Sequence, residues 1–576
     1  MDLRFKVFLL VIAWAAAVSA GYAAQSAVKS DVPVALPPFI VEEPTKGPPW
    51  RYAQAMGYEV LSRCNDATSR RVIEAHDRLH QLLSDVLPPA LQLKLTVPRA
   101  LILYDEELQP AASKEVIARM LQKPTGPLPL DLGNVGPVGG GRGGMRPVSA
   151  PPAFSFLPNL RLWDRDSMTV FMIVRRDDFD DARLSLTFDY VSYRLKNRVP
   201  TLAPWFLGGF LAFFRHTHFE RRELITDPME WISSAHTSAL KIDPKTAPGL
   251  LPIGDFLAVT LEPGDPAATF TPFQRWQAQA EVFVRWGLDP KGGTRKASFW
   301  KFAELSARRE ANEALFQECF GFGFAEADAQ LAAYLPEVVR RTLRFRPQLK
   351  KPPPVVFRNA TDGELGRIKG DWERLEIGYV KQHAPGLADK YIEQARRTLQ
   401  RAYERGVRDP ELLAVLGLCE IDAGAEATGR EYLETAAVLG PIRPRAWYEL
   451  ARLRFAELRQ DATQKDGRLT ATQAVTVLRP LFSARESEPP LPEVYELIAD
   501  VWADCETPPT RGHLGVLDEG VRLFPRRSSL VYRAAELNLR NGYHVQAAEL
   551  VGVGLNGATD EAMRTKFEQL QQQLPR

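Results

Sequence analysis

The sequence predicts an α+β domain followed by an all-α solenoid of helical repeats. Three observations support this fold class: short β-branched runs at 100–104 and 168–174, helical hydrophobic patterns from residue 182 onward, and an eight-residue pattern that recurs after 34 positions beyond residue 363. With 576 residues the chain is long enough for several domains, since one domain takes about 100–200 residues. Its hydrophobic share of 45% is ordinary for globular proteins.

The first residues have the layout of a secretory signal. Arg4 and Lys6 precede an unbroken apolar run from 7 to 18, and small residues then offer cleavage after Ala20, Ala23 or Ala24. The run is shorter than the roughly 20 residues that cross a bilayer. We therefore expect residues 1–24 to be a signal peptide of a bacterial protein that is periplasmic or secreted, with no membrane span after cleavage. A retained anchor is the alternative.

Charge and cysteine content exclude some classes of function. The formal net charge is +2, and loss of Asp2, Arg4 and Lys6 leaves +1. This balance gives no electrostatic reason to bind nucleic acid. The four cysteines are far apart, without disulfide-framework or zinc-ribbon spacing: Cys64, Cys319, Cys419 and Cys505. We expect buried thiols, and one long-range disulfide stays open.

The α+β domain is expected between residues 55 and 345, after an extended Pro-rich linker at 25–54. It begins with a strand at 57–64 and an amphipathic helix at 68–87. Residues 122–152 are rich in Gly and Pro and predict a mobile insertion, because such a composition cannot bury a core. Phosphate binding there lacks the strand-to-helix turn and the Lys-Ser/Thr pair that it needs.

Helical patterns follow the insertion. Leu184, Phe188, Val191 and Leu195 recur with the spacing of one helix face. The next segment, 204–214, is apolar nearly all round, which indicates a deeply buried helix. Further helices are expected around 273–286, 299–309 and 325–343.

Repeats begin after a linker at 346–362. Residues 410–417 (PELLAVLG) are echoed 34 positions later by 444–451 (PRAWYELA). Further copies lie at 492–499 and 528–535, and 364–408 looks like a divergent first pair. The period and the small eighth residue are those of a tetratricopeptide (TPR) repeat. Such units stack because none can bury its apolar face alone. Residues 363–576 therefore predict TPR-like repeats that end in a capping helix.

The middle domain also resembles the peptidase-MA-like gluzincins. The resemblance covers roughly 55–345 and rests mainly on 187–193 (TFDYVSY) and 204–214 (PWFLGGFLAFF), with support at 251–254, 283–286 and 319–321. Gluzincins are zinc metallopeptidases with His-Glu-x-x-His on one helix and a Glu ligand on the next. The resemblance thus implies a gluzincin-like α+β fold and a zinc site between two helices.

The residues at those positions depart from the family pattern. Phe188 and Ser192 stand where the two His ligands belong, Asp189 replaces the general-base Glu, and Ala212 stands at the third ligand position. Zinc needs nitrogen, sulfur or carboxylate ligands, which Phe and Ala do not offer. We expect a pseudopeptidase without metal or cofactor, its former site filled with hydrocarbon.

Other histidines leave an enzymatic alternative open. His76 and His80 have i, i+4 spacing, and His216 and His218 follow the second helix of the degenerate site. We interpret the first pair as structural and the second as part of a surface loop. The alternative is a divergent hydrolase that uses a relocated metal or Asp189 alone.

Function is then expected to depend on binding a protein or peptide through the repeats. By helix position, six residues are candidates for a partner-binding groove: Tyr448, Glu449, Arg452, Tyr495, Arg533 and Glu536. The alternative is that they are ordinary solvated helix faces. A role in assembling the cell envelope is a variant of the same hypothesis. The sequence does not predict the partner or the oligomeric state.

Overall fold

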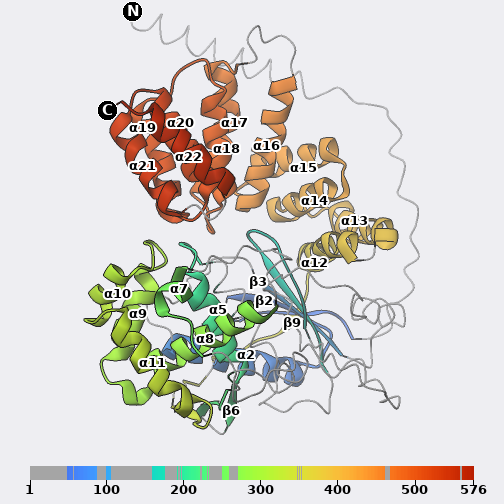
Figure 1. Ribbon diagram of the computed structural model, residues 1–576. Helices are drawn as coiled ribbons and strands as arrows, with labels where there is room; N and C mark the ends of the chain where they lie inside the picture. The colour runs from blue at the N-terminus through green and yellow to red at the C-terminus, as the bar shows by residue number, and fades with distance from the viewer. Residues whose placement is uncertain are drawn as a thin grey trace, which may run out of the picture. The chain divides into compact units, whose positions relative to one another are not determined.

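The computed structural model describes residues 48–55, 57–86, 99–105, 159–174, 191, 195, 198–220, 223–229, 231, 249–258, 270–346, 348, 350–351, 353–383, 385–460, 468–557 and 561–575. By their internal contacts these residues belong to one unit, 48–576. Figure 1 labels their helices and strands. The predicted signal peptide at 1–24 and the predicted insertion at 122–152 lie outside the described residues.

A six-stranded mixed sheet organises the first part of the chain. Its strand order is β4-β5-β3-β2-β1-β9. Strands β2, β3 and β5 run parallel, whereas β1, β4 and β9 each pair antiparallel with a neighbour. The bounds are β1 Arg51–Ala55, β2 Tyr58–Ser62, β3 Arg99–Asp105, β4 Asn159–Trp163, β5 Met168–Val174 and β9 Arg358–Asn359.

Each face of this sheet belongs to a different apolar cluster. Val60 and Leu101 cluster with Val72 of α2 (Asp66–Val86), whereas their neighbours Leu61 and Ile102 cluster with Trp372 of α12 (Asp362–His383). The division arises because successive side chains of a strand point to opposite faces. The first helix of the predicted repeats therefore also covers the sheet.

A group of helices and a small sheet follow. The helices are α5 Pro204–Arg215, α7 Ile253–Ala258, α8 Phe270–Leu288, α9 Arg295–Leu305, α10 Glu313–Phe320 and α11 Phe324–Val338. Strands β6 (Thr217–Glu220), β7 (Glu223–Thr226) and β8 (Leu343–Phe345) form an antiparallel sheet. Helices α5 and α8 pack closely against each other, and their side chains belong to the same core as the α2 face of the large sheet.

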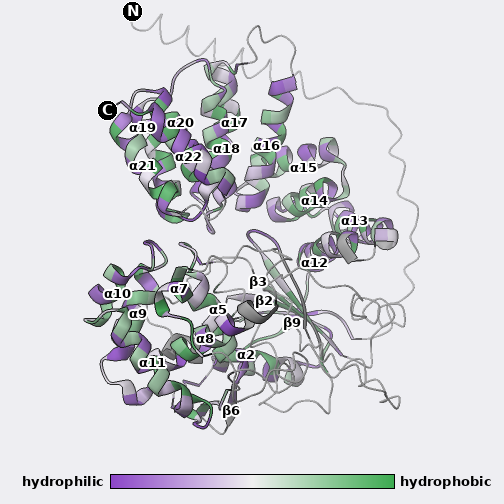
Figure 2. Cartoon of the chain, in the orientation of Figure 1, coloured by the Kyte–Doolittle hydropathy of each residue, from purple (hydrophilic) through white to green (hydrophobic). Residues whose placement is uncertain are grey.

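From α12 onward the chain is an all-α array of helix pairs. The helices after α12 are α13 Ala388–Glu404, α14 Pro410–Ala423, α15 Glu426–Leu439, α16 Pro444–Gln460, α17 Ala471–Arg485, α18 Pro492–Ala503, α19 Arg511–Leu523, α20 Ser528–Arg540, α21 His544–Gly557 and α22 Glu561–Gln573. Each packs on the next, and the first helices of successive pairs also contact one another, in the order α12, α14, α16, α18, α20. These helices carry both hydrophilic and hydrophobic residues (Figure 2).

The small eighth residue of each predicted repeat lies at a close helix contact. A Cβ added to Gly417 would lie 2.7 Å from the Leu433 side chain and 2.9 Å from the Gly429 carbonyl oxygen. The corresponding Ala451, Ala499 and Ala535 are at most 1% exposed. The prediction of a TPR-like helical array is therefore confirmed in its packing.

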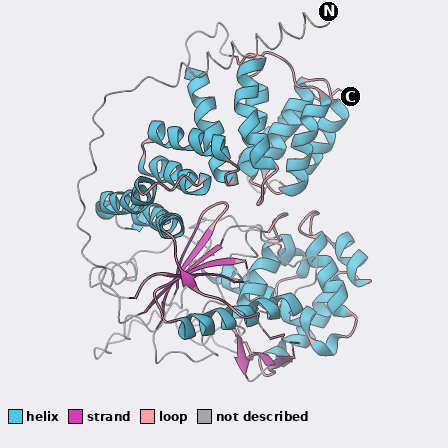
Figure 3. Ribbon diagram, turned by 180° about the vertical axis from the view of Figure 1, so that it is seen from behind, coloured by secondary structure: helices cyan, strands magenta, loops and turns pink. Residues whose placement is uncertain are grey.

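Two strands lie in segments for which the sequence predicts linkers. Strand β1 occupies the end of 25–54, and β9 lies within 346–362; the two strands pair with each other. Figure 3 shows the strands in magenta and the helices in cyan. Short strands such as β9, with only two residues, leave no periodic signal. None of the described helices has both the length and the apolar composition needed to cross a membrane.

The four cysteines are free thiols and all are buried. Burial raises the pKa of Cys64 and of Cys419 to about 12. The expectation of buried thiols is confirmed, and the disulfide that the sequence left open is not formed.

Candidate functional site

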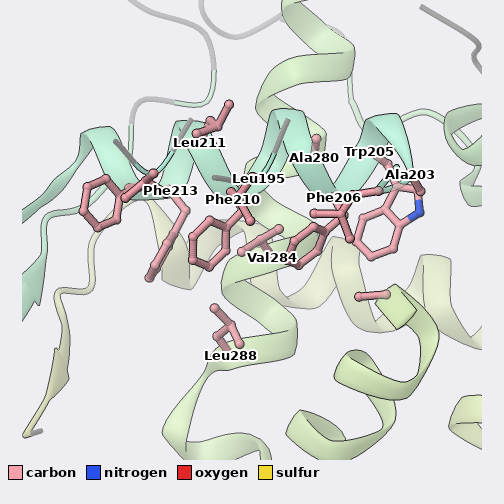
Figure 4. Packing of buried hydrophobic residues seen from close by; sticks show 14 of the residues in the cluster. Leu195, Ala203, Trp205, Phe206, Phe210, Leu211, Phe213, Ala280, Val284 and Leu288 are labelled. Carbon is pink, nitrogen blue, oxygen red and sulfur yellow. The ribbon is translucent and has the colours of Figure 1, made fainter. Parts of the chain in front are cut away.

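Helix α5 carries the position where the gluzincin resemblance puts the third zinc ligand. Its residues Trp205, Phe206, Phe210 and Phe213 are at most 2% exposed. Figure 4 shows Phe206, Phe210 and Phe213 along one side of the helix, next to Val284 of α8. The Phe206 and Phe210 rings stack with centroids 5.5 Å apart. The helix is buried because it offers the surrounding elements almost only hydrocarbon.

A glycine sets how closely α5 approaches α8. An ideal Cβ on Gly209 would lie 2.2 Å from the carbonyl oxygen of Ala280 and 2.9 Å from the Val284 side chain. No larger residue fits at this distance without moving one of the helices. The backbone of α8 thus occupies the space beside Gly209.

The degenerate site is described only in part. Ala212 is 7% exposed, so its methyl group belongs to the buried side of α5. Phe188, Asp189 and Ser192 lie outside the described residues, but Val191 and Leu195 of the same predicted stripe are 1% and 0% exposed. Among the described residues, no group of three or more His, Cys, Asp or Glu side chains is arranged to hold a metal ion.

The histidines after α5 are each paired with a different carboxylate. His216 Nδ1 lies 2.8 Å from Glu281 Oε1, and His218 Nδ1 lies 3.2 Å from Asp227 Oδ2. Glu281 is buried and also accepts a hydrogen bond of 2.7 Å from Arg285 Nε, a fully buried guanidinium. Both imidazoles are more than 40% exposed, so the predicted surface position is confirmed. The prediction of a loop is wrong for His218, which lies in strand β6 and pairs with Ile225 of β7.

The two histidines of the early helix are not equally described. His76 is 3% exposed and its ring meets Tyr58 edge to face, with centroids 4.7 Å apart. The side chain of His80 lies outside the described residues. The buried ring contact of His76 fits the structural interpretation of this pair.

A second site lies where the turn between β4 and β5 contacts helices of the repeat array. Four residues, Asp164 to Ser167, join these strands, and the Asp164 N–H donates to the Ser167 carbonyl oxygen at 2.8 Å. The Asp164 and Asp166 side chains are only 7% and 0% exposed. Carboxylates are rarely so buried unless they are paired, and here three arginines pair them.

Arg374 of α12, Arg443 just before α16 and Arg445 in the first turn of α16 are those arginines. Arg374 donates to Asp164 Oδ2 at 2.9 Å, and Arg445 also donates to that oxygen. Arg443 Nε donates to Asp166 Oδ1 at 2.9 Å, and its Nη2 donates to Ser167 Oγ at 2.5 Å. The guanidinium groups of Arg374 and Arg445 thus contact Asp164, whereas that of Arg443 contacts both carboxylates, with its Nη2 3.3 Å from Asp164 Oδ2.

Two aspartates of the array orient these arginines. Asp371 of α12 accepts hydrogen bonds from Arg374 (2.8 Å) and Arg443 (3.2 Å). Asp422 of α14 accepts from Arg374 (2.7 Å) and Arg445 (2.6 Å). We call Arg374, Arg443, Arg445, Asp371 and Asp422 the receptor cluster. Its members come from three successive helix pairs, so their arrangement depends on the stacking of the repeats.

The surrounding charges favour the ionised forms of Asp164 and Arg374. Burial alone would raise the pKa of Asp164, but Arg374, Arg445 and Arg443 together hold it well below its usual range. Burial would likewise lower the pKa of Arg374, but Asp371, Asp164 and Asp422 raise it well above its usual value. Asp164 therefore remains ionised, and Arg374 remains cationic, at any physiological pH.

The six predicted groove residues fall into two groups. Glu449 and Tyr495 are buried, at 6% and 1% exposure, and so are not exposed contact groups. Tyr495 donates to Glu519 at 2.8 Å, and Glu449 accepts from Arg452 at 2.7 Å. The other four are half-buried: Tyr448, Arg452, Arg533 and Glu536.

One of these residues borders the turn. The ring of Tyr448 lies under the guanidinium of Arg165, with a distance of 5.4 Å from Cζ to the ring centroid. Sequence reasoning missed the receptor cluster itself. One signal was present: the residue before α16 is Arg443, which lacks the side-chain oxygen with which Ser, Thr, Asp or Asn usually caps a helix, so the first N–H groups of α16 were open to an acceptor from another part of the chain.

Comparisons with known proteins add little to this picture. The chain matches no known family profile and no curated protein. Solved structures that are similar to part of it include two bacterial proteins. A thermophilic TPR protein of Thermus thermophilus is 20% identical, with 35% of this chain and 99% of that chain covered and a TM-score of 0.25. Pseudomonas aeruginosa pilF is 14% identical, with 36% and 87% covered and a TM-score of 0.26.

Proposed function

We propose that this chain is an exported protein-binding scaffold, in which a gluzincin-like domain without a metal site supports a TPR-like array. The binding surface is the face that the first helices of the pairs contribute. Stacked repeats create extended surfaces of this kind, and charged side chains gather there. An example is Arg533 of α20, whose Nε lies 3.2 Å from Asp500 Oδ1 of α18.

The packing of α5 is the observation that carries the non-catalytic half of the proposal. A gluzincin needs a carboxylate at position 212, which here is a buried Ala on a helix lined by aromatic rings. A carboxylate at this position would lose its hydration without a partner, at a cost of several kcal/mol. Phe and Ser at 188 and 192 complete the loss of a ligand set. The present residues do not fit a zinc ion.

Metal content and hydrolysis test that half. The mature protein, purified without chelator, should contain far less than one zinc per chain and should not cleave casein. Its melting temperature should stay unchanged in EDTA. Stoichiometric zinc with EDTA-sensitive cleavage would contradict the proposal and would favour the divergent hydrolase.

Photo-crosslinking in the producing cell tests the binding half. A crosslinking amino acid at Glu536, on the first helix α20, should give a discrete adduct with another protein. The matched control is Glu549, an exposed residue of the second helix α21. Adducts of equal yield from both positions, or none from Glu536, would contradict a partner on the first-helix face.

A further inference from the structure

The β4–β5 turn is held in the way that a bound peptide is held. Its side chains form hydrogen bonds with the receptor cluster between residues more than 200 positions apart in sequence. Both Asp side chains project from one short turn onto the array. The segment is contiguous and only four residues long, so a separate peptide with the same side chains could present the same groups.

The two carboxylates occupy different kinds of subsite. Asp166 Oδ2 accepts the backbone N–H of Arg445 at 2.8 Å, in the first turn of α16, where the helix dipole favours an anion. Its other oxygen accepts from Arg443. Asp164 instead lies among the guanidinium groups of Arg374, Arg443 and Arg445. One carboxylate therefore meets a helix end, and the other meets three cations.

Arg165, the residue between the two aspartates, faces a third subsite, which is acidic. Arg165 is 43% exposed; its Nη1 lies 3.8 Å from Glu493 of α18, and its guanidinium lies over Tyr448. Ser167 adds a hydroxyl that accepts from Arg443. The array thus distinguishes acidic, basic, acidic and hydroxyl side chains in succession.

The net charge of the receptor cluster is opposite in sign to that of the two Asp side chains. Three arginines and two aspartates give the receptor cluster a formal charge of +1 (+3 − 2), and the Asp164 and Asp166 side chains change the total to −1 (+1 − 2). An empty cluster would leave three guanidinium groups, one of them buried (Arg374), with only two carboxylates. Removal of one partner from such a buried network is costly, so the cluster favours an acidic occupant.

We propose that the receptor cluster is a binding site for acidic turns of the type Asp-x-Asp, and that residues 164–167 occupy it in cis. This inference rests on the proposed protein-binding function and adds the ligand class and the site. A partner that carries an exposed Asp-x-Asp turn competes with the chain's own hairpin. Arg374, Arg443 and Arg445 provide the recognition, and Asp371 and Asp422 hold them in place.

Peptide binding to the full mature chain tests this inference. The probe is a fluorescent cyclic peptide of residues 161–170 (RLWDRDSMTV), and its control carries Asn at both Asp positions. In D164N/D166N the cis turn loses both carboxylates, whereas the five residues of the receptor cluster are unchanged. A site occupied in cis has a reduced apparent affinity, so this variant should bind the probe roughly tenfold or more tightly than the wild type.

Further variants keep the outcome interpretable. The triple variant D164N/D166N/R443Q should lose the gain in affinity, and the Asn control peptide should bind none of the proteins. D164N alone retains the Asp166 carboxylate that accepts from the first turn of α16, so its gain in affinity for the probe should be smaller. This single variant replaces the double variant in the test if the double variant does not fold. A folded D164N or D164N/D166N variant that binds no more tightly than wild type would overturn the inference.

The peptide assay, together with the crosslinking at Glu536, separates the acidic-turn site from the general proposal of a protein-binding array. If the peptide does not bind but Glu536 still gives its crosslinked adduct, the array binds partners elsewhere and only the acidic-turn site is wrong. If inorganic phosphate displaces the peptide at equal concentration, the cluster is a general anion site, which also contradicts recognition of an Asp-x-Asp turn.

Discussion

The carboxylate of Asp166, in the turn between β4 and β5, accepts a hydrogen bond of 2.8 Å from the backbone N–H of Arg445, 279 positions further along the chain. Arg443 accepts the first hydrogen bonds of α16 through its carbonyl oxygen but has no side-chain oxygen to cap the helix. A residue of the sheet therefore supplies the cap of a repeat helix. The β4–β5 turn thus stabilises the start of α16, the first helix of the third pair.

Loss of this cap should destabilise the chain strongly. Asp166→Ala removes the helix cap and also leaves Arg443 buried without its main partner. Breaking a buried ion pair by removing one member costs about 3–5 kcal/mol, and we expect a loss in this range in urea unfolding. The control is Glu393→Ala, because its ion pair with Arg397 is at least 70% exposed on both sides. If the two variants are equally stable, Asp166 does not have this role.

The contact of α5 with α8 predicts opposite effects for two glycines. Gly209→Ala places a Cβ against the Ala280 carbonyl oxygen, and overpacking of this kind costs about 1–3 kcal/mol or more. Gly378→Ala, on α12 with open space around its Cβ position, should stabilise by up to about 1 kcal/mol through helix propensity. Thermal unfolding of both variants checks the difference in sign. Equal effects would show that α5 and α8 are not in close contact.

A buried carboxylate on α12 predicts a dependence of stability on pH. Burial, and then the charge of Glu373, raise the pKa of Glu376 from 4.5 to about 8. Glu373 itself is buried and accepts from Lys369 Nζ at 2.6 Å. Between pH 4.5 and 8 the folded chain therefore binds a proton that the unfolded chain has lost, so stability falls as pH rises through this window. Above pH 8 the penalty is constant.

Glu376→Gln should remove this dependence. The variant keeps the shape of the side chain without the charge, so it should gain stability relative to wild type as pH rises from 5 to 8, at up to about 1.4 kcal/mol per pH unit. Urea unfolding at several pH values measures the gain. Glu393→Gln on an exposed helix face is the control and should show no comparable gain between pH 5 and 8. A constant difference between Glu376→Gln and wild type would mean that Glu376 ionises normally.

The repeats could be predicted from the sequence because their signal is local and periodic. The 34-residue spacing of 410–417 and 444–451 places both segments at the starts of α14 and α16. Strand β5 was predicted with its observed bounds, since a β-branched apolar run marks a buried strand. Strand β4 was missed because its residues (NLRLW) mix charged and apolar types over only five positions.

The receptor cluster could not be predicted, because each of its members looks ordinary in its own helix. Asp371 and Arg374 resemble a solvated i, i+3 pair, and Asp422 resembles a surface residue near the end of α14. They become a site only when stacking brings three helix pairs together with a turn from another part of the chain. The groove prediction from helix position selected Tyr448 but could not identify the acidic turn beside it.

A double-mutant cycle between Asp166 and Arg443 tests most directly whether the turn is bound to the array by paired charges. The free energy of urea unfolding would be measured for wild type, Asp166→Asn, Arg443→Gln and the double variant. Residues of one buried network couple by about 0.5–3 kcal/mol, and the two contacts between these side chains predict a value of about 1.5 kcal/mol or more. Additivity within about 0.5 kcal/mol, the behaviour of distant and independent sites, would contradict the account.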